Sequence, residues 1–156
     1  MERILAAHAD PDQPHATFRA IEAVLAEAPG HILFTILAHH PALHISERCY
    51  SNMPDAYPIG GRKPVTDSAW MQQVIHGGEP YIGRTHADIA AHFTDHALIH
   101  SLGCESILNM PARWCGQTLG TLNLCHRAGH YSESDLPRLR LVAQLAVPAL
   151  LKVSAG

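Results

Sequence analysis

Two apolar segments joined by five residues in the last third of the chain constrain its fold most. The first runs from Cys104 to Pro111 and the second from Gln117 to Cys125, and each has the length and apolar content of a β-strand. The connection, residues 112–116, ends in glycine and has the spacing of a hairpin loop. We therefore predict an antiparallel strand pair here, and with it an antiparallel sheet.

The N-terminal part of the chain predicts a helix followed by two strands. Segment 16–28 places Phe18 and Ile21 on one face of an amphipathic helix, which the following Pro-Gly pair ends. Segment 31–39 is short and apolar on both faces, as a central strand is, and segment 44–50 is predicted as its neighbour. These elements supply the next two strands of the sheet.

The middle of the chain is richest in structure-breaking residues. Proline and glycine interrupt segment 51–64 so often that we predict a long ordered loop there rather than a helix or strand. Three further elements are then expected in order: a short helix capped by Thr66 or Asp67 and running to Ile75, a brief strand at 79–82, and a helix at 87–102 closed by Gly103.

The last segment predicts a C-terminal helix. Ser132 and Asp135 have the spacing of an N-terminal capping box, and the residues that follow form an apolar stripe from Leu136 to Leu150, interrupted only by Pro148. Helices at both ends and an antiparallel sheet between them predict an α+β fold with helices packed on the faces of the sheet.

Size and composition limit the chain to one folded unit. With 156 residues, 47% of them hydrophobic and 16% charged, it can bury its own core, which excludes a disordered linker. We expect a single domain over 1–156, with an N-terminal extension at 1–14 and a domain core at 15–152.

Charge and cysteine usage limit the partners. The formal net charge of −3 leaves no basic surplus for nucleic acid. No apolar stretch approaches the roughly 20 residues of a membrane helix, and the N-terminus has no signal-peptide core. The four cysteines contain no CxxC pair and are expected as free thiols. These features predict a cytoplasmic protein without nucleic-acid or membrane partners.

The segment Gly103–His126 resembles the GAF domain family, which shows a small residue, an apolar strand, a proline, a tight hairpin, Leu-Gly and a second apolar strand in this order. The downstream Tyr-Ser-Glu-Ser-Asp-Leu and its helix are similar to the closing helix of that family, and the resemblance extends over residues 15–152. It implies a stand-alone sensory domain with a five- or six-stranded antiparallel sheet, terminal helices on one face and a small-molecule pocket on the other. Segment 53–102 would close this pocket. The Asn-Lys-Phe-Asp-Glu signature of cyclic-nucleotide-binding members is absent.

Candidate ligand-binding residues lie in and around the glycine-containing loop. Gly60 and Gly61 allow close backbone approach, and Arg62 can bind a carboxylate or phosphate with two hydrogen bonds. Aromatic walls and inward-pointing amides would suit a small planar or anionic ligand. The alternative is that these residues are solvated loop charges and ordinary core. The predicted ligand-binding residues are Tyr57, Arg62, Trp70, Tyr81, Phe93, Asn109 and Asn123.

A thiol-dependent enzyme is the first alternative. The resemblance includes free methionine-(R)-sulfoxide reductases, in which a pocket thiolate attacks the sulfoxide sulfur. Their Gly-Val-Cys-Gly stretch is absent here, and segment 51–78 contains no cysteine. Cys104 is the candidate nucleophile, whereas a buried cysteine acting as a small hydrophobic residue is the structural alternative.

A metal or haem sensor is the second alternative. His92, His96 and His100 recur at four-residue spacing, which on one helix aligns three imidazoles along one stripe. A solvated helix face explains the same spacing. Cys125 and His126 are similar to the Cys-His pair to which bilins attach, but the surrounding motif is missing.

The sequence therefore favours a non-catalytic regulatory domain in signal transduction. It predicts an unidentified small-molecule ligand and no cofactor. Apolar residues on segments 16–28 and 136–152 are numerous enough to face both the sheet and a partner, so we expect a homodimer through the terminal helices or a signalling partner protein.

Overall fold

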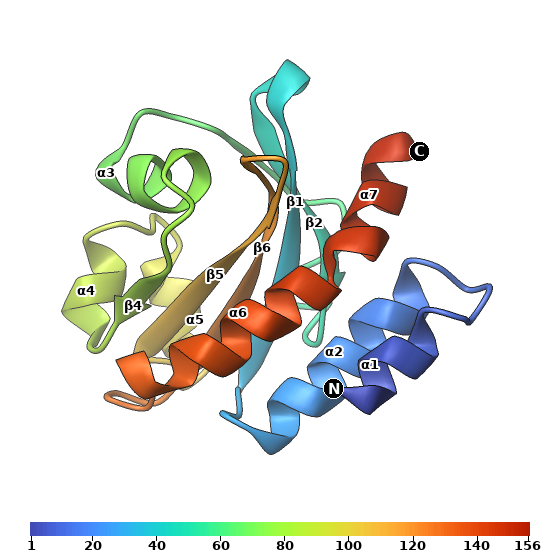
Figure 1. The fold of residues 1–156 in the computed structure, drawn as a ribbon. Coiled ribbons are helices and arrows are strands. Elements are labelled where there is room, and N and C mark those ends of the chain that lie inside the picture. Colours follow the sequence, from blue (N-terminus) through green and yellow to red (C-terminus); the bar gives the residue numbers. More distant parts are fainter.

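A six-stranded antiparallel sheet in the order β3-β2-β1-β6-β5-β4 forms the centre of the computed structural model, which describes all residues from Met1 to Gly156 (Figure 1). The architecture is α+β, as predicted. The strands are β1 (Leu33–His40), β2 (Ile45–Ser51), β3 (Arg62–Pro64), β4 (Tyr81–Gly83), β5 (Ser106–Trp114) and β6 (Gln117–His126). The helices are α1 (Glu2–Ala7), α2 (His15–Glu27), α3 (Ala69–Met71), α4 (His86–Ala90), α5 (His96–Ser101), α6 (Leu136–Leu145) and α7 (Val147–Ala155). Three shorter turns complete the list: η1 (Pro41–Leu43), η2 (Gln72–His76) and η3 (Glu133–Asp135).

The predicted hairpin is present and is tighter than its sequence indicated. β5 and β6 pair antiparallel from Ser106 opposite His126 to Trp114 opposite Gln117. Only Cys115 and Gly116 form the turn, and both have positive φ, at 50° and 74°. This conformation matches the twist of two paired strands. The predicted five-residue loop was wrong because residues 112–114 continue the strand.

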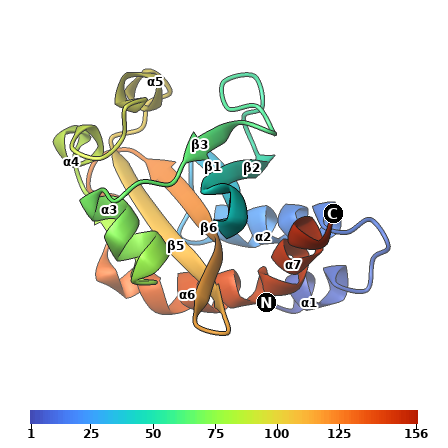
Figure 2. The same ribbon diagram turned by 90° about the horizontal axis from the view of Figure 1, so that it is seen from above.

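The two faces of the sheet are covered by different parts of the chain (Figure 2). The terminal helices α1, α2, α6 and α7 cover one face, and the middle segment with α3, α4 and α5 covers the other. Side chains alternate along each strand. Phe34 and Ile36 of β1 therefore join the main core of 22 buried residues under the terminal helices, whereas Leu33 and Thr35 point to the other face.

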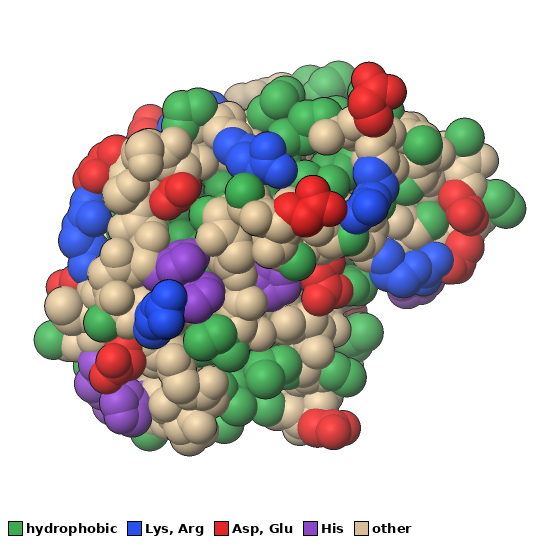
Figure 3. All heavy atoms as spheres, turned by 90° about the horizontal axis from the view of Figure 1, so that it is seen from below, with side chains coloured by type: hydrophobic (Ala, Val, Ile, Leu, Met, Phe, Trp, Pro, Cys, Tyr) green, Lys and Arg blue, Asp and Glu red, His purple; other side chains and the backbone are tan.

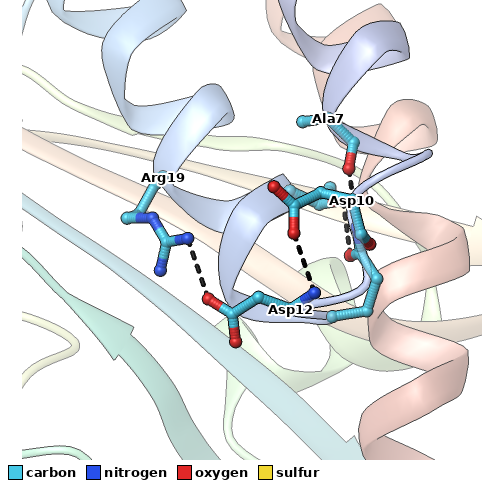
Figure 4. A network of polar contacts seen from close by, with 6 residues as sticks. Ala7, Asp10, Asp12 and Arg19 are labelled. Carbon is cyan, nitrogen blue, oxygen red and sulfur yellow. Dashed lines mark hydrogen bonds and ion pairs between the residues drawn. The ribbon is translucent and has the colours of Figure 1, made fainter.

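The N-terminal helix α1 is part of this helical layer. Its Ile4 is fully buried in the main core. Hydrogen bonds fix the connection to α2: Gln13 Nε2 donates to Ala7 O at 2.7 Å, and the Asp12 amide donates to Asp10 Oδ1 at 2.8 Å (Figure 4). Arg19 of α2 completes the network with a 2.9 Å ion pair to Asp12.

The helix at the C-terminus begins at the predicted capping box. The Ser132 side chain and the Asp135 carboxylate cap each other's backbone amides. The helical segment that follows is divided into α6 and α7 near Pro148, because proline cannot donate the backbone hydrogen bond that would continue α6.

The middle segment departs from the prediction in three places. Residues 62–64, expected as loop, form the edge strand β3, where proline is tolerated. Ser68, rather than Thr66 or Asp67, caps the short helix, with its Oγ accepting from the Met71 amide at 3.3 Å. The predicted helix 87–102 is two helices, α4 and α5, with a turn between them.

Two irregularities in strand pairing increase the number of polar side chains on the second face. The register shifts between Ile36 and Leu37, so that Cys49 is an extra residue in β2, and again between Ala112 and Arg113, so that Leu119 is an extra residue in β6. At each bulge two consecutive residues of one strand point to the same face of the sheet, so the alternation of side chains shifts by one residue beyond the bulge. Thr118 therefore lies beside Arg113.

The surface mixes both signs of charge. Acidic and basic side chains are interspersed on the face shown in Figure 3, with groups of histidines among them. No helix of the structure combines the length and the apolar character needed to cross a lipid bilayer.

Candidate functional site: a cavity with a polar floor

A cavity of about 380 Å³ lies between the second face of the sheet and the middle segment. Strands β1, β2, β5 and β6 form its floor, and the residues between β3 and α5 form its walls. It is lined by Leu33, Thr35, Leu37, Ser46, Arg48, Tyr57, Lys63, Pro64, Thr66, Ser68, Trp70, Met71, His92, Phe93, Thr94, Asp95, Ile99, Ile107, Asn109, Asn123 and Cys125. Cavities of this volume with a mostly apolar lining and a few convergent polar groups are typical of small-molecule sites.

Two buried amides form the centre of the floor. Asn109 and Asn123 face each other across β5 and β6, and Asn109 Nδ2 donates to Asn123 Oδ1 at 2.8 Å. The indole Nε1 of Trp70 donates to Asn109 Oδ1 at 3.1 Å. Both amides are at least nine-tenths buried, so the network ties the wall to the floor.

One edge of the cavity carries charge. Arg48 of β2 is 8% exposed, its Nη1 donates to Pro58 O at 3.0 Å, and its guanidinium lies 4.8 Å from the centre of the Tyr57 ring. The Tyr57 hydroxyl in turn donates to Asp95 Oδ2 at 2.7 Å. Burial and then the hydrogen bond to Asp95 raise the pKa of Tyr57. Lys63 completes the group, with its Nζ 3.9 Å from Asp95 Oδ1.

Two buried polar atoms of this charged edge have no hydrogen-bond partner, although one of them forms the 3.9 Å ion pair with Lys63. They are Arg48 Nε, a hydrogen-bond donor, and Asp95 Oδ1, an acceptor. Buried polar groups in proteins are nearly always paired, so an unpaired donor and acceptor on a cavity wall are suited to a ligand. The three ionisable side chains Arg48, Lys63 and Asp95 sum to one positive charge.

Aromatic rings form another part of the lining. Trp70 and Phe93 meet edge to face with centroids 5.5 Å apart. His92 also lines the cavity, and its ring meets Tyr81 edge to face at 5.0 Å. These rings offer flat apolar area to a ligand.

The structure brings five of the seven predicted ligand-binding residues to this cavity: Tyr57, Trp70, Phe93, Asn109 and Asn123. Arg62 lies outside it, in a 2.9 Å ion pair with Glu47 at the sheet edge. Tyr81 packs behind the wall and donates its hydroxyl to Asp88 O at 2.9 Å. Arg62 does not line the cavity because the pairing of β2 with β3 places it opposite Glu47 at the sheet edge.

The three charged residues of the site were missed: Arg48, Lys63 and Asp95. Arg48 looked like an ordinary residue of a half-exposed strand. The bulge at Cys49 gave no signal in the sequence, although it sets which side chains of β2 face the cavity. The signal available for Lys63 was its place in the same glycine-containing loop as Arg62.

Two of the four cysteines lie next to each other as thiols. Cys125 lines the cavity, whereas Cys104 lies behind it in the same hydrophobic cluster. A hydrogen bond from the Cys125 thiol lowers the pKa of Cys104, and the same bond, with burial, raises the pKa of Cys125. All four cysteines are free.

The three predicted histidines do not form one helical stripe. Phe93 and Asp95 both line the cavity. Residues two apart on a helix point to nearly opposite sides, so one continuous helix could not direct both side chains into the cavity. His92 consequently lies before α5, at the cavity. His96 and His100 instead meet His86, with ring centroids 5.4 and 4.6 Å away. No three His, Cys, Asp or Glu side chains in the structure are arranged to hold a metal ion.

Comparisons with known proteins agree with this fold. No curated protein sequence matches the chain significantly. Among solved structures, the GAF domain of a phosphoenolpyruvate-protein phosphotransferase from Coxiella burnetii superposes with a TM-score of 0.76 at 14% identity, over 99% of this chain and 91% of that one. The GAF domain of a two-component sensor histidine kinase from Bacillus halodurans gives 0.68 at 16% identity, over 88% and 93%. A far-red cyanobacteriochrome photoreceptor gives 0.70 at 12% identity, over 99% and 94%.

The family comparison covers most of the chain. The profile described as "GAF domain" matches residues 14–150, which include every strand of the sheet and the helices α2 to α6. The chain belongs to the GAF domain family.

Proposed function

We propose that this GAF domain is a sensory module that binds a small organic anion in the 380 Å³ cavity. The observation that carries the proposal is a pair of buried atoms without hydrogen-bond partners, Arg48 Nε and Asp95 Oδ1, on one wall of an otherwise mostly apolar cavity. A ligand with a carboxylate and a hydrogen-bond donor would satisfy both, and its flat or aliphatic body would lie against Trp70 and Phe93.

The sensory part of this proposal rests on the relatives. The solved structures include domains of a sensor histidine kinase, a methyl-accepting chemotaxis protein and photoreceptors. By analogy, ligand binding to this chain would be read by a partner protein or by a second copy of the chain.

The test is a thermal-stability screen with small carboxylic acids of flat and aliphatic shape. A ligand present at about 100 times its dissociation constant should add about 2.7 kcal/mol to the free energy of unfolding. Arg48→Gln should abolish the stabilisation by any hit, and the matched surface variant Arg62→Gln should retain it. A hit that stabilises Arg48→Gln as well as the wild type would refute the site.

Dimerisation would give the domain a route for its signal. Leu5, Leu141 and Leu151 of the helical layer are 51%, 52% and 38% exposed, so apolar area remains on the side away from the sheet. We expect a concentration-dependent dimer in sedimentation, and Leu141→Glu should shift it to monomer. A wild-type monomer at all accessible concentrations would exclude this route.

A thiol-dependent reductase is the second candidate, and the contact between Cys104 and the cavity residue Cys125 favours it. In that reaction one thiolate attacks the sulfoxide sulfur and the second thiol closes a disulfide. The substrate is released as the thioether, and the sulfoxide oxygen leaves as water. Free methionine sulfoxide should then disappear with the wild type and a dithiol reductant, but not with Cys104→Ser. No turnover by the wild type would remove this candidate.

A further inference from the structure

A second cavity, of about 290 Å³, lies on the same face of the sheet but at its other end. The β1–β2 turn, the β5–β6 hairpin and the segment after α3 meet there, at the upper end of the molecule in Figure 1. Along β1, Leu37 lines the first cavity and His39, the next side chain on that face, lines the second. Neither the family resemblance nor the proposed ligand site accounts for this second cavity.

The lining of the second cavity is basic. Four of its ten residues are His39, His44, His76 and Arg113, and none is Asp or Glu. The whole chain has a formal net charge of −3, so the acidic residues lie elsewhere. A cleft lined by one sign of charge concentrates ions of the opposite sign.

The Arg113 guanidinium is fixed in place before any ligand binds. Its Nη1 donates to Thr118 Oγ1 at 2.8 Å and its Nη2 donates to Gly116 O at 2.7 Å. Thr118 is itself held, because its hydroxyl donates to Ile75 O at 2.7 Å. A Cβ on Gly78 would lie 2.6 Å from Arg113 Cζ, so the glycine backbone packs directly against the guanidinium. Two of five N–H groups are used, which leaves three for a ligand.

His39 adds an unsatisfied group. Its Nδ1 is buried and has no hydrogen-bond partner. Burial lowers the pKa of His39, a hydrogen bond with the Ile45 backbone raises it, and repulsion from His76, His40 and His44 lowers it further. His40 does not line the cavity, and its Nε2 lies 4.0 Å from Glu47 Oε2. The three neighbouring histidines therefore disfavour a proton on His39, and an anion between them would reverse this effect.

We infer that this cavity, which we call the histidine cleft (His39, His44, His76 and Arg113), binds a phosphoryl group. Arg113 offers its free N–H groups in the fork geometry that matches phosphate oxygens, and each of the three imidazole rings supplies a further N–H donor. The volume of 290 Å³ leaves room for a small organic substituent beside the phosphoryl group.

The experiment is calorimetric titration of the whole chain with inorganic phosphate and, separately, with glycerol phosphate, each at constant ionic strength. We expect saturable binding at concentrations up to about 10 mM. Tighter binding of glycerol phosphate would identify a phosphate ester as the ligand, and tighter binding of inorganic phosphate would identify the free ion. No saturable binding of either overturns the inference.

Variants locate the site. His76→Gln changes an exposed side chain and should weaken binding about tenfold without unfolding the protein, because a hydrogen bond to a charged group is lost. Arg113→Gln should weaken it at least as much, and His15→Gln, an exposed histidine of α2, should bind as the wild type does. Unchanged binding by both His76→Gln and Arg113→Gln refutes the histidine cleft. Arg48→Gln should leave phosphate binding intact, so this result is independent of the proposed ligand site.

Discussion

The two faces of one sheet differ in how they are filled. Under the terminal helices, 22 buried residues form a continuous core with apolar side chains from every covering helix. Under the middle segment, the buried apolar residues divide into clusters of seven and three, and the rest of the space is cavity and polar side chains. The same strands supply both faces, because neighbouring side chains point in opposite directions.

This difference separates stability from recognition. The helical face can be packed to the density that stabilises a small domain, since no ligand has to enter it. The other face keeps unpaired donors and acceptors and leaves space unfilled, which costs stability and creates binding sites. Variants placed on matching positions of the two faces test this division.

The largest contrast is expected between two leucines on neighbouring strands. Leu122 is fully buried on the helical face, whereas Leu37 is half-buried and borders the cavity. Leu122→Ala should lower the free energy of unfolding by about 3–5 kcal/mol, because it leaves an empty space in a packed core. Leu37→Ala should cost less than about 2 kcal/mol, because the cavity already leaves part of its surface without contacts. Chemical denaturation of both variants checks this, and equal losses would contradict the division.

Two glycines give the next contrast. A Cβ on Gly120 would lie 2.2 Å from the backbone oxygen of Leu37 and 3.0 Å from Leu150, so Gly120→Ala must separate β6 from β1 or move α7. We expect a loss of about 3 kcal/mol. A Cβ on Gly61 would meet Arg48 Nη1 at 2.6 Å, which is the far end of a side chain rather than backbone. Gly61→Ala should therefore change the melting temperature little but weaken carboxylate binding, and a large loss of stability would argue against this assignment.

The amide network on the cavity floor should contribute less. Asn109→Ala removes the partners of the Trp70 indole N–H and of Asn123 Oδ1, both buried. An unsatisfied buried group costs about 1–3 kcal/mol, which we expect in thermal denaturation. Gln117→Ala, at the exposed end of the same hairpin, is the control and should change stability by less than about 0.5 kcal/mol. A neutral Asn109→Ala would mean that water satisfies the network.

The smallest expected effect is that of pH. Burial lowers the pKa of His31 and of His39, so the unfolded chain binds more protons than the folded one near the ordinary histidine pKa. Stability should therefore fall as pH drops from about 7 to 5, by about 1 kcal/mol or less for these partly solvated groups. His31→Gln should flatten the fall seen in melting temperature, and phosphate should flatten it through the histidine cleft. A rise in stability as the pH drops from about 7 to 5 would contradict this prediction.

Some of these features could be predicted from residue patterns alone. The amphipathic spacing in α2, the capping box before α6 and the apolar run of β1 are local signals, and the structure has an element at each. The connection of β5 and β6 fixed their antiparallel pairing. The prediction of one helix over 87–102 was wrong because local helix propensity competes there with tertiary contacts. Those contacts place both Phe93 and Asp95 at the cavity.

The site was only partly accessible to such reasoning. Trp70 was chosen as an aromatic wall, and Asn109 and Asn123 as inward-pointing amides of the hairpin strands, and the three side chains do meet. Arg48 was not chosen, because its burial depends on a bulge one residue away and on a loop folding over it. Pairing register between distant segments decides such contacts, and no short stretch of sequence encodes it.

The amino-acid sequence by itself determined the α+β class, the antiparallel pairing of β5 with β6 and the helices that cover one face. Periodicity and capping act within a few residues, so short stretches of sequence encode these features. Only the tertiary structure decided which charges face a cavity, that the histidines gather with Arg113 in a second cleft, and that Arg62 turns outward. Those outcomes depend on strand register and on which loop crosses which strand, and both are set by the free energy of the whole packed chain.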